Sequence, residues 1–191
     1  MRWARWEVRM SLVDLHDRYT QDGFLFLKGF FPFEAAASLR AAADTLPGKR
    51  VEVNDTRITW WEQCVPNGHP LDAIFCGPKV MSVVRTALGQ TRRRRLDYTV
   101  WVSTYRLGEY VNEHKDRDGI IQIVLGLQAG PAECGGESIL RITDRIVRVF
   151  LTAGDLLVFD AASIPHSTTP VCAGPDGSVV NRVVAVARYY E

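Results

Sequence analysis

The part of the chain from residue 96 to residue 191 is a succession of short apolar runs that are rich in β-branched and aromatic residues. These runs, bounded by Gly, Asp or Pro, predict strands at 96–106, 111–115, 119–128, 137–142, 145–151, 155–160, 164–171 and 180–190. Eight strands suit a double-sheet jelly roll, which closes its edges and leaves a mouth between the sheets. The sequence therefore predicts a mainly β protein with flanking helices and a double-stranded β-helix, cupin-like core.

The first part of the chain has helical spacing of its apolar residues instead. It predicts helices at 11–22, 33–46 and 79–88, and a buried aromatic strand at 24–31. Ser11 is placed to cap the first helix, and Gly89 to end the last. With 47% hydrophobic and 24% charged residues, the chain fits one globular domain over residues 1–191. Within it, residues 11–95 would support a jelly-roll core formed by residues 96–191.

Charge and hydropathy exclude several classes of partner. The formal net charge of +1 gives no overall field that would attract nucleic acid or an anionic membrane. Arg92 to Arg95 follow a predicted helix and are interpreted as a solvated helix end rather than a phosphate site. There is no run of 18 apolar residues, so we expect no membrane span. Residues 1–9 are either an upstream start or a frayed extension.

The cysteines indicate the compartment. The four cysteines are scattered without a Cys-x-x-Cys pair, in a chain large enough to be stable without crosslinks. This distribution favours free thiols in a reducing compartment and disfavours a zinc site built from cysteines. The N-terminus also lacks the apolar segment of a signal peptide. We therefore expect a cytoplasmic protein, and its oligomeric state is left open.

Three potential metal ligands stand out in the strand-rich part. His114 and Asp116 are two residues apart, so on a strand they would share a face, and His166 comes from a later strand. Two imidazoles and one carboxylate can occupy one face of an octahedron and leave the opposite positions open, which is typical of non-haem Fe(II) oxygenases. A His-x-Asp pair alone is more often a solvated loop, and His16 and His69, which lack such context, are interpreted as structural. The three residues together predict a catalytic iron site.

The residues around these ligands occur in a recognisable order. The motifs are Tyr105-Arg-Leu-Gly108, His114-Lys-Asp116, the apolar run 120–127, Gly135-Gly136-Glu137, Gly154-Asp155, His166 and, on the last strand, Arg182. This order resembles the prolyl-hydroxylase-like branch of the Fe(II)- and 2-oxoglutarate-dependent dioxygenases. The resemblance covers roughly residues 96 to 191. The aromatic segment 19–31 is in addition similar to the opening of the phytanoyl-CoA hydroxylase-like members.

The resemblance implies a dioxygenase that uses Fe(II), 2-oxoglutarate and O₂ to hydroxylate or otherwise oxidise a small-molecule substrate. Succinate and CO₂ would be the co-products. The resemblance implies that His114, Asp116 and His166 are both the metal ligands and the catalytic residues. Arg182 would bind the distal carboxylate of 2-oxoglutarate, because a guanidinium can hold a carboxylate through two hydrogen bonds.

Further cosubstrate contacts follow from the same resemblance. Tyr105 matches the family tyrosine that often forms a hydrogen bond with 2-oxoglutarate. The position two residues beyond Arg182 lacks the Ser or Thr of several branches, so Thr168 is the candidate for that hydroxyl. The loop 173–178 lengthens the segment before Arg182, which leaves Arg188, on the same strand face, as the alternative anchor.

Two other functions are weighed against this one. Arg182 and Arg188 are six residues apart, as in the paired-arginine signature of nucleic-acid demethylases of the same superfamily, but the Asn and Thr-Phe of that signature are absent. The second alternative is a catalytically silent jelly-roll protein that binds a metal or a ligand. Trp60, Trp61 and Trp101 are interpreted as core residues, because paired tryptophans are more often buried than part of a binding surface. We expect a small-molecule substrate, with a protein substrate left open as an alternative, and no nucleic-acid or membrane partner.

Overall fold

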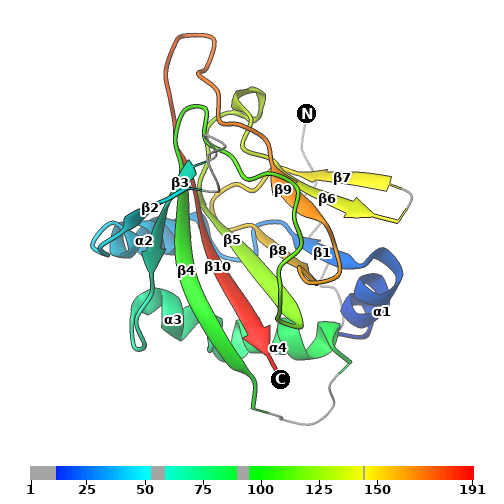
Figure 1. Cartoon of the computed structure of the whole chain (residues 1–191). Coiled ribbons are helices and arrows are strands. Elements are labelled where there is room, and N and C mark those ends of the chain that lie inside the picture. Colours follow the sequence, from blue (N-terminus) through cyan, green and yellow to red (C-terminus); the bar gives the residue numbers. More distant parts are fainter. Residues whose placement is uncertain (1–11, 53–58, 90–94, 144) are drawn as a thin grey trace, which may run out of the picture.

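Two antiparallel sheets form the centre of the molecule (Figure 1). The computed structural model describes residues 12–52, 59–89, 95–143 and 145–191. In this part of the chain the larger sheet has seven strands in the order β1-β8-β5-β10-β4-β3-β2. Their bounds are β1 Phe24–Leu27, β2 Lys49–Glu52, β3 Thr59–Cys64, β4 Asp97–Tyr105, β5 Ile121–Gln128, β8 Leu156–Phe159 and β10 Arg182–Tyr190.

The smaller sheet has three described strands in the order β7-β6-β9, with bounds β6 Ser138–Ile142, β7 Arg145–Val149 and β9 His166–Thr168. An apolar cluster that includes Val124, Leu140 and Phe159 packs between the two sheets. Each neighbouring pair of strands is antiparallel, as a jelly roll requires. The mainly β, double-sheet fold that the sequence predicted is confirmed.

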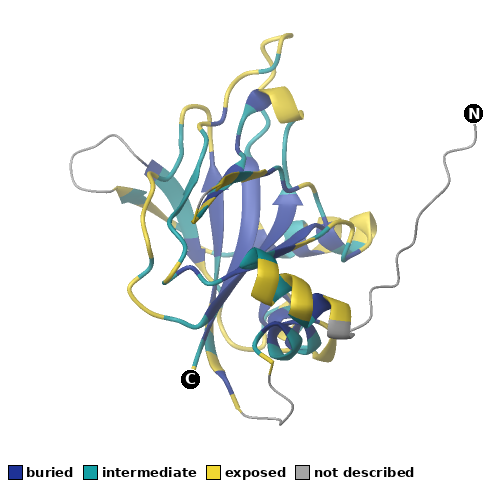
Figure 2. Ribbon diagram, turned by 90° about the vertical axis from the view of Figure 1, so that its right-hand side faces the viewer, coloured by how far each residue is buried: buried dark blue, intermediate teal, exposed yellow. Residues whose placement is uncertain are grey.

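Helices form a second apolar core with the other face of the larger sheet. In the described chain they are α1 Leu12–Asp22, α2 Phe33–Ala43, α3 Pro70–Phe75 and α4 Pro78–Ala87, with a 3-10 helix η1 at Ala132–Cys134. Helix α2 packs on β5 and α3 on β4, while α1 packs mainly on α4. In Figure 2 the buried strands run through the middle of the molecule and the helices expose their outer faces. The sheet is thus covered on one side, and the other side is left to build a cavity.

Strand β10 lies between β4 and β5 and is buried on both faces. Ala185 and Ala187 belong to the core under the helices, whereas Val184 belongs to the cluster between the sheets. Because side chains alternate along a strand, Arg182 and Arg188 lie on the same face as Val184. Both arginines line a cavity between the two sheets.

Most predicted elements are confirmed, with differences at their ends. The strand predicted at 24–31 ends at Leu27, because Gly29 turns the chain with φ of +59° and donates its N–H to the buried Asp155 carboxylate at 2.7 Å. The strand predicted at 164–171 is limited to β9, which is flanked by Pro165 and Pro170. Gly89 follows α4 with φ of +63°, as its expected role at the helix end requires.

Some predictions were wrong or incomplete. Residues 111–115 form no strand ladder; this segment meets β9 through one β-bridge at His114 and through hydrogen bonds between Val111 and Thr168. The hairpin β2–β3 and helix α3 were not predicted, because the Thr59–Cys64 segment mixes aromatic and polar residues without a clear period. Ser11, residues 1–9 and Arg92–Arg94 lie outside the described residues. Arg95 is exposed, 4.0 Å from the Asp97 carboxylate.

His16 and His69 form local hydrogen bonds, and the cysteines form no disulfide in the described chain. His16 Nδ1 lies 3.0 Å from the carbonyl oxygen of Thr86, and His69 caps α3 by accepting the N–H of Leu71 at 3.2 Å. All four cysteines are free thiols. Among the described helices, none is both long enough and apolar enough to cross a membrane.

Asp155 provides a test of how the loops are fixed to the sheet. Its carboxylate, in a residue that is 2% exposed, accepts the N–H of Gly29 and both the N–H and the hydroxyl of Thr152. We expect Asp155→Ala to lower the free energy of unfolding by about 2–4 kcal/mol, because three donors lose a buried partner. Urea denaturation measures this loss. Asp176→Ala, which removes one exposed hydrogen bond to Ser178, is the control, and an equal loss there would contradict the prediction.

Candidate active site

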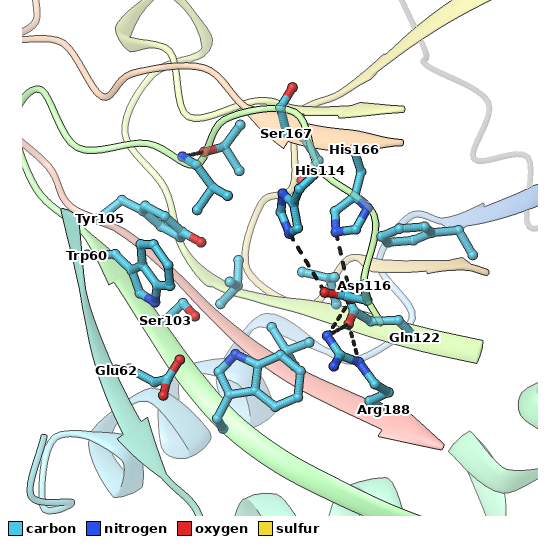
Figure 3. A pocket seen from close by; sticks show the side chains of 18 of the residues that line it. Trp60, Glu62, Ser103, Tyr105, His114, Asp116, Gln122, His166, Ser167 and Arg188 are labelled. Carbon is cyan, nitrogen blue, oxygen red and sulfur yellow. Dashed lines mark hydrogen bonds and ion pairs between the residues drawn. The ribbon is translucent and has the colours of Figure 1, made fainter. Parts of the chain in front are cut away.

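His114, Asp116 and His166 come together on one wall of the cavity between the two sheets (Figure 3). Their potential ligand atoms all lie within 4.8 Å of one another. Asp116 Oδ1 is 3.7 Å from His114 Nε2, and Asp116 Oδ2 is 3.9 Å from His166 Nε2. Small side-chain rotations would allow all three to contact one divalent ion at about 2.0–2.2 Å. The structure thus brings together the three residues that the sequence analysis selected.

Backbone hydrogen bonds determine this arrangement. The N–H of His114 donates to the carbonyl of His166 at 3.0 Å, and the N–H of His166 donates back at 2.8 Å. The N–H of Asp116 donates to the carbonyl of Ala161 at 2.9 Å. The loop that carries His114 and Asp116 is therefore held against β9 and the segment before it. This replaces the shared strand that the sequence predicted for these two residues, because a single bridge is sufficient to fix their positions.

Each imidazole is oriented by a backbone carbonyl. His114 Nδ1 lies 2.8 Å from the carbonyl oxygen of Asn112, and His166 Nδ1 lies 3.0 Å from that of Ile164. A carbonyl oxygen can only accept, so each Nδ1 carries a proton, and in the neutral form of such a ring the lone pair is on Nε2. This is the orientation that histidine ligands of metals usually have.

The electrostatics of His166 favour its neutral form. Burial is the main cause that lowers its pKa below the ordinary value, and the charge of His114 acts in the same direction. The hydrogen bond to the Ile164 carbonyl and the carboxylate of Asp116 raise the pKa, but they offset the effect of burial only in part. At neutral pH the ring can therefore bind a metal ion without first releasing a proton.

Arg188 holds the carboxylate of the triad. Its Nη2 forms an ion pair with Asp116 Oδ2, and its Nε and Nη2 lie 3.2 and 3.1 Å from Gln122 Oε1. Its guanidinium also stacks over the ring of Trp101, 5.2 Å from the centroid. The donors of Arg188 are thus directed at protein groups. Its position indicates that it orients Asp116.

Arg182, by contrast, is a buried cation with a hydrogen-bond donor that has no partner among the described residues. It is 4% exposed, Nη2 donates to Ser138 Oγ at 2.9 Å, and Nε has no hydrogen-bond partner among the described residues. Its guanidinium carbon lies 5.0 Å from the centroid of the Tyr105 ring. Burial lowers the pKa of Arg182, while Tyr105 raises it. A buried guanidinium with free donors is suited to bind an anion.

The Gly-Gly pair of the sequence motif makes room for this arginine. Gly136 has φ of +75°, and a Cβ atom there would lie 3.0 Å from Cδ and 3.4 Å from Cβ of Arg182. A side chain at this position would therefore press on the arginine as well as strain the backbone. Two residues later the chain enters β6 with Ser138, the hydrogen-bond partner of Arg182. The motif thus shapes the surroundings of Arg182 from the side of the smaller sheet.

Tyr105 and Thr168 both line the cavity. Tyr105 lies opposite Arg182 in the β4–β10 ladder and is 7% exposed. Burial raises its pKa, which keeps the phenol protonated and able to donate a hydrogen bond. Thr168 Oγ1 accepts the N–H of Val111 at 2.8 Å, so its own hydroxyl proton is available for another acceptor.

The cavity has a volume of about 420 Å³ and opens between the two sheets. Its walls also include Trp60, Glu62 and Trp101. Trp60 and Trp101 pack against the apolar cluster between the sheets, as core residues would, and they line the cavity as well. Trp61 is not among the lining residues, and the guanidinium of Arg106 lies 5.5 Å from its ring centroid. Sequence reasoning missed Ser138, although its place at an alternate position after the glycine pair was a usable signal. It missed Glu62 because the strand that carries it was not predicted.

Comparisons with known proteins bear on the fold. No protein-family model and no curated protein matches the sequence. Solved structures do match, among them a 2OG-Fe(II) oxygenase family oxidoreductase from Burkholderia pseudomallei, with a TM-score of 0.76, 16% identity, and coverage of 100% of this chain and 93% of that one. A prolyl-4-hydroxylase from Pseudomonas putida has a TM-score of 0.74 and 19% identity, covering 95% of this chain and 99% of that chain.

A third match is the non-heme α-ketoglutarate-dependent epimerase SnoN from nogalamycin biosynthesis. It has a TM-score of 0.75 and 17% identity, and the match covers 94% of this chain and 82% of that chain. At such low identities the similarity concerns the fold. The chain has the jelly-roll fold of the 2-oxoglutarate- and Fe(II)-dependent oxygenases, which confirms the fold that the sequence resemblance predicted.

Lowering the pH should destabilise the metal-free protein partly through His166. In the unfolded chain this histidine has an ordinary pKa of about 6.5, whereas the folded pKa is lower. Between the two values the unfolded state binds more protons, so stability falls as the pH falls through this window. Urea unfolding at about pH 7.5 and about pH 5.5 measures the slope. We expect His166→Asn to have a shallower slope, and equal slopes would contradict the lowered pKa.

Proposed function

We propose that this protein is an Fe(II)- and 2-oxoglutarate-dependent dioxygenase that oxidises a small molecule. The observation that carries the proposal is one cavity lined both by a two-histidine, one-carboxylate set and by the buried Arg182 with an unpaired Nε. The fold alone would not suffice, because one fold can host many functions. The combination of a possible metal site and an anion site in the same small cavity is what this cosubstrate chemistry needs.

The donor set supports iron as the metal. His114, Asp116 and His166 would hold Fe(II) on one face and leave its other positions for the cosubstrate and O₂. Arg188 keeps the Asp116 carboxylate oriented toward the two Nε2 atoms. The fixed imidazole tautomers need no rearrangement before metal binding.

Arg182 supports 2-oxoglutarate as the cosubstrate. Its free Nε and its Nη2 atom, beside Ser138, would bind the distal carboxylate through charge-assisted hydrogen bonds. Tyr105 and Thr168 would each donate a hydroxyl proton to the same molecule. Without such an anion the guanidinium would be a buried charge with only the hydroxyls of Ser138 and Tyr105 as hydrogen-bond partners among the described residues, which is costly.

When bound, Fe(II) and 2-oxoglutarate supply the activation of O₂, so that one oxygen atom enters the substrate and the other enters succinate as CO₂ is released. The protein provides binding, orientation and exclusion of water. Apolar side chains, including Val124, Leu140 and Val184, line the cavity beside the triad and Arg182. The volume of about 420 Å³ lies in the range of pockets for small ligands.

Activity assays separate this proposal from its alternatives. A dioxygenase of small molecules should form succinate in the presence of a small amine, amino acid or natural-product scaffold. A nucleic-acid demethylase would instead release formaldehyde from a methylated oligonucleotide. A catalytically silent binding protein would bind Fe(II) and 2-oxoglutarate and form no succinate with either class of substrate.

The metal ligands are tested by single substitutions. We expect His114→Ala, Asp116→Ala and His166→Ala each to abolish tight Fe(II) binding and turnover, because two remaining ligands cannot hold a labile divalent ion at such a site. Asp116→Glu should be nearly as damaging, since the longer side chain misplaces the oxygen. Anaerobic calorimetry with Fe(II) measures binding, and His69→Ala, which removes only a helix cap, is the control. Near-normal iron affinity in any triad variant would exclude that residue as a ligand.

The cosubstrate anchor is tested by comparing the two arginines of β10. Arg182→Ala should raise the 2-oxoglutarate concentration needed for half-saturation by about a hundredfold or more, because the cosubstrate carboxylate would be buried without its partner. Arg188→Ala should have a smaller effect on this concentration and a larger effect on iron affinity, since it contacts Asp116. Succinate formation at varied 2-oxoglutarate gives the half-saturating concentration for each variant, and anaerobic calorimetry with Fe(II) gives the iron affinity. A larger cosubstrate effect for Arg188→Ala would reassign the anchor.

A further inference from the structure

One wall of the cavity is built by the strands β3 and β4, and it carries a carboxylate between two indoles. Glu62 lies opposite Ser103 in the β3–β4 ladder, and Cys64 lies opposite Trp101. Alternation therefore puts Trp60, Glu62 and Trp101 on the face that lines the cavity. In Figure 3 Trp60 and Glu62 lie across the cavity from the two histidines.

Glu62 differs from the other charged side chains of the cavity. Asp116 has Arg188 and the two histidines as partners, and Arg182 has a hydroxyl and a proposed anion. In the part of the chain that the structure describes, no hydrogen bond or ion pair reaches the Glu62 carboxylate. The residue is only half-buried, so water can solvate this carboxylate until a ligand replaces the water.

Glu62 is also kept apart from the nearest buried cation. Glu62 is on β3 and Arg182 is on β10, with β4 between them, so their backbones are about 10 Å apart across the sheet. Tyr105 is close to both charges: burial is the main cause that raises its pKa, Arg182 lowers the pKa, and Glu62 raises it. Arg182 and Glu62 thus form two sites of opposite charge in one cavity.

We propose that Glu62, together with Trp60 and Trp101, binds a positively charged nitrogen of the substrate, such as an alkylammonium group. This assignment names the substrate class of the dioxygenase and in that sense rests on the proposed function. The carboxylate supplies a charge-assisted partner for the ammonium, and the indoles offer faces that attract cations. The Arg188 guanidinium already stacks over the Trp101 ring, so among the described residues Trp60 is the indole of this wall without a cation over its ring.

A neutral substrate would bind less favourably against this wall than a cation. Closing an apolar ligand over Glu62 would remove water from a carboxylate without giving it a partner. An anionic substrate would be repelled by Glu62 as well. A cation avoids both costs, and the preference should amount to about tenfold or more over a neutral molecule of the same shape.

Matched pairs of probes test the proposal. The pairs are choline with 3,3-dimethylbutan-1-ol, and phenethylamine with 2-phenylethanol, each titrated into the full chain and followed by tryptophan fluorescence and calorimetry. The wild-type protein should bind each cation about tenfold or more tightly than its neutral counterpart, and Glu62→Gln should reduce this preference to within about twofold. Equal affinities within the pairs, a preference that survives in Glu62→Gln, or no binding of either cation would overturn the proposal.

Lys49 provides the control for a purely structural role of Glu62. It lies opposite Glu62 in the β2–β3 ladder and is exposed, so it is the nearest candidate for a surface ion pair. Lys49→Ala should leave the preference for cations unchanged or increase it, because it removes a competing charge. If Lys49→Ala and Glu62→Gln lose stability equally and neither alters cation binding, Glu62 is a structural residue and the proposal is wrong.

The outcome can be separated from that of the proposed function. Cation binding is measured first on the metal-free protein, and Fe(II) and 2-oxoglutarate binding are measured independently. Glu62→Gln should leave the affinities for Fe(II) and 2-oxoglutarate within about twofold of wild type, since Glu62 contacts neither the triad nor Arg182. Failure of the wild-type protein to bind 2-oxoglutarate would refute the proposed dioxygenase function. A missing preference for cations would refute only the proposed substrate class.

Discussion

Strand β10, hydrogen-bonded on both sides, is the constraint on which the site depends. Its pairing with β4 and β5 fixes the register of the whole inner face. Arg182 and Arg188, six residues apart on that face, are held about 20 Å apart along the strand. One arginine therefore reaches the triad carboxylate while the other lies near Tyr105 and Ser138. A slip of the register by one residue would turn both guanidiniums into the core under the helices.

The separation of these charges explains how a small cavity can hold several ionised groups. Arg188 is neutralised locally by Asp116, so the pair adds little net field to the rest of the cavity. Arg182 lacks a carboxylate partner, and in a poorly hydrated site its charge acts strongly on an anion. If the arginines were closer, each would weaken the hold of the other on its partner. The length of one strand thus allows a metal site and an anion site to coexist.

The sequence predicted what depends on local order and missed what depends on long-range pairing. The triad residues and Arg182 could be found because motifs in a fixed order pointed to them. The strand expected at 111–115 was wrong, because a hydrogen-bonded bridge to His166 takes the place of a ladder there, and such a bridge leaves no period in the sequence. The β2–β3 hairpin was missed for a related reason, since it is the pairing of β3 with β4 that turns the face of Trp60 and Glu62 toward the cavity. Glu62 could therefore not be recognised as a cavity residue from the sequence.

The residues of the cavity differ in how strongly the fold restricts their substitution. The proposed metal ligands and Arg182 lie on β9, β10 and a loop held against β9, where backbone hydrogen bonds and burial restrict substitution. Trp60 and Glu62 lie on β3, toward the edge of the larger sheet. In the described sheet, the short strand β2 is the one strand that lies outside β3. A change of charge at such a position disturbs few buried contacts, so it can alter substrate choice while the chemistry stays intact. The wall formed by Trp60, Glu62 and Trp101 is thus the part of the cavity where the physical cost of a new specificity is lowest.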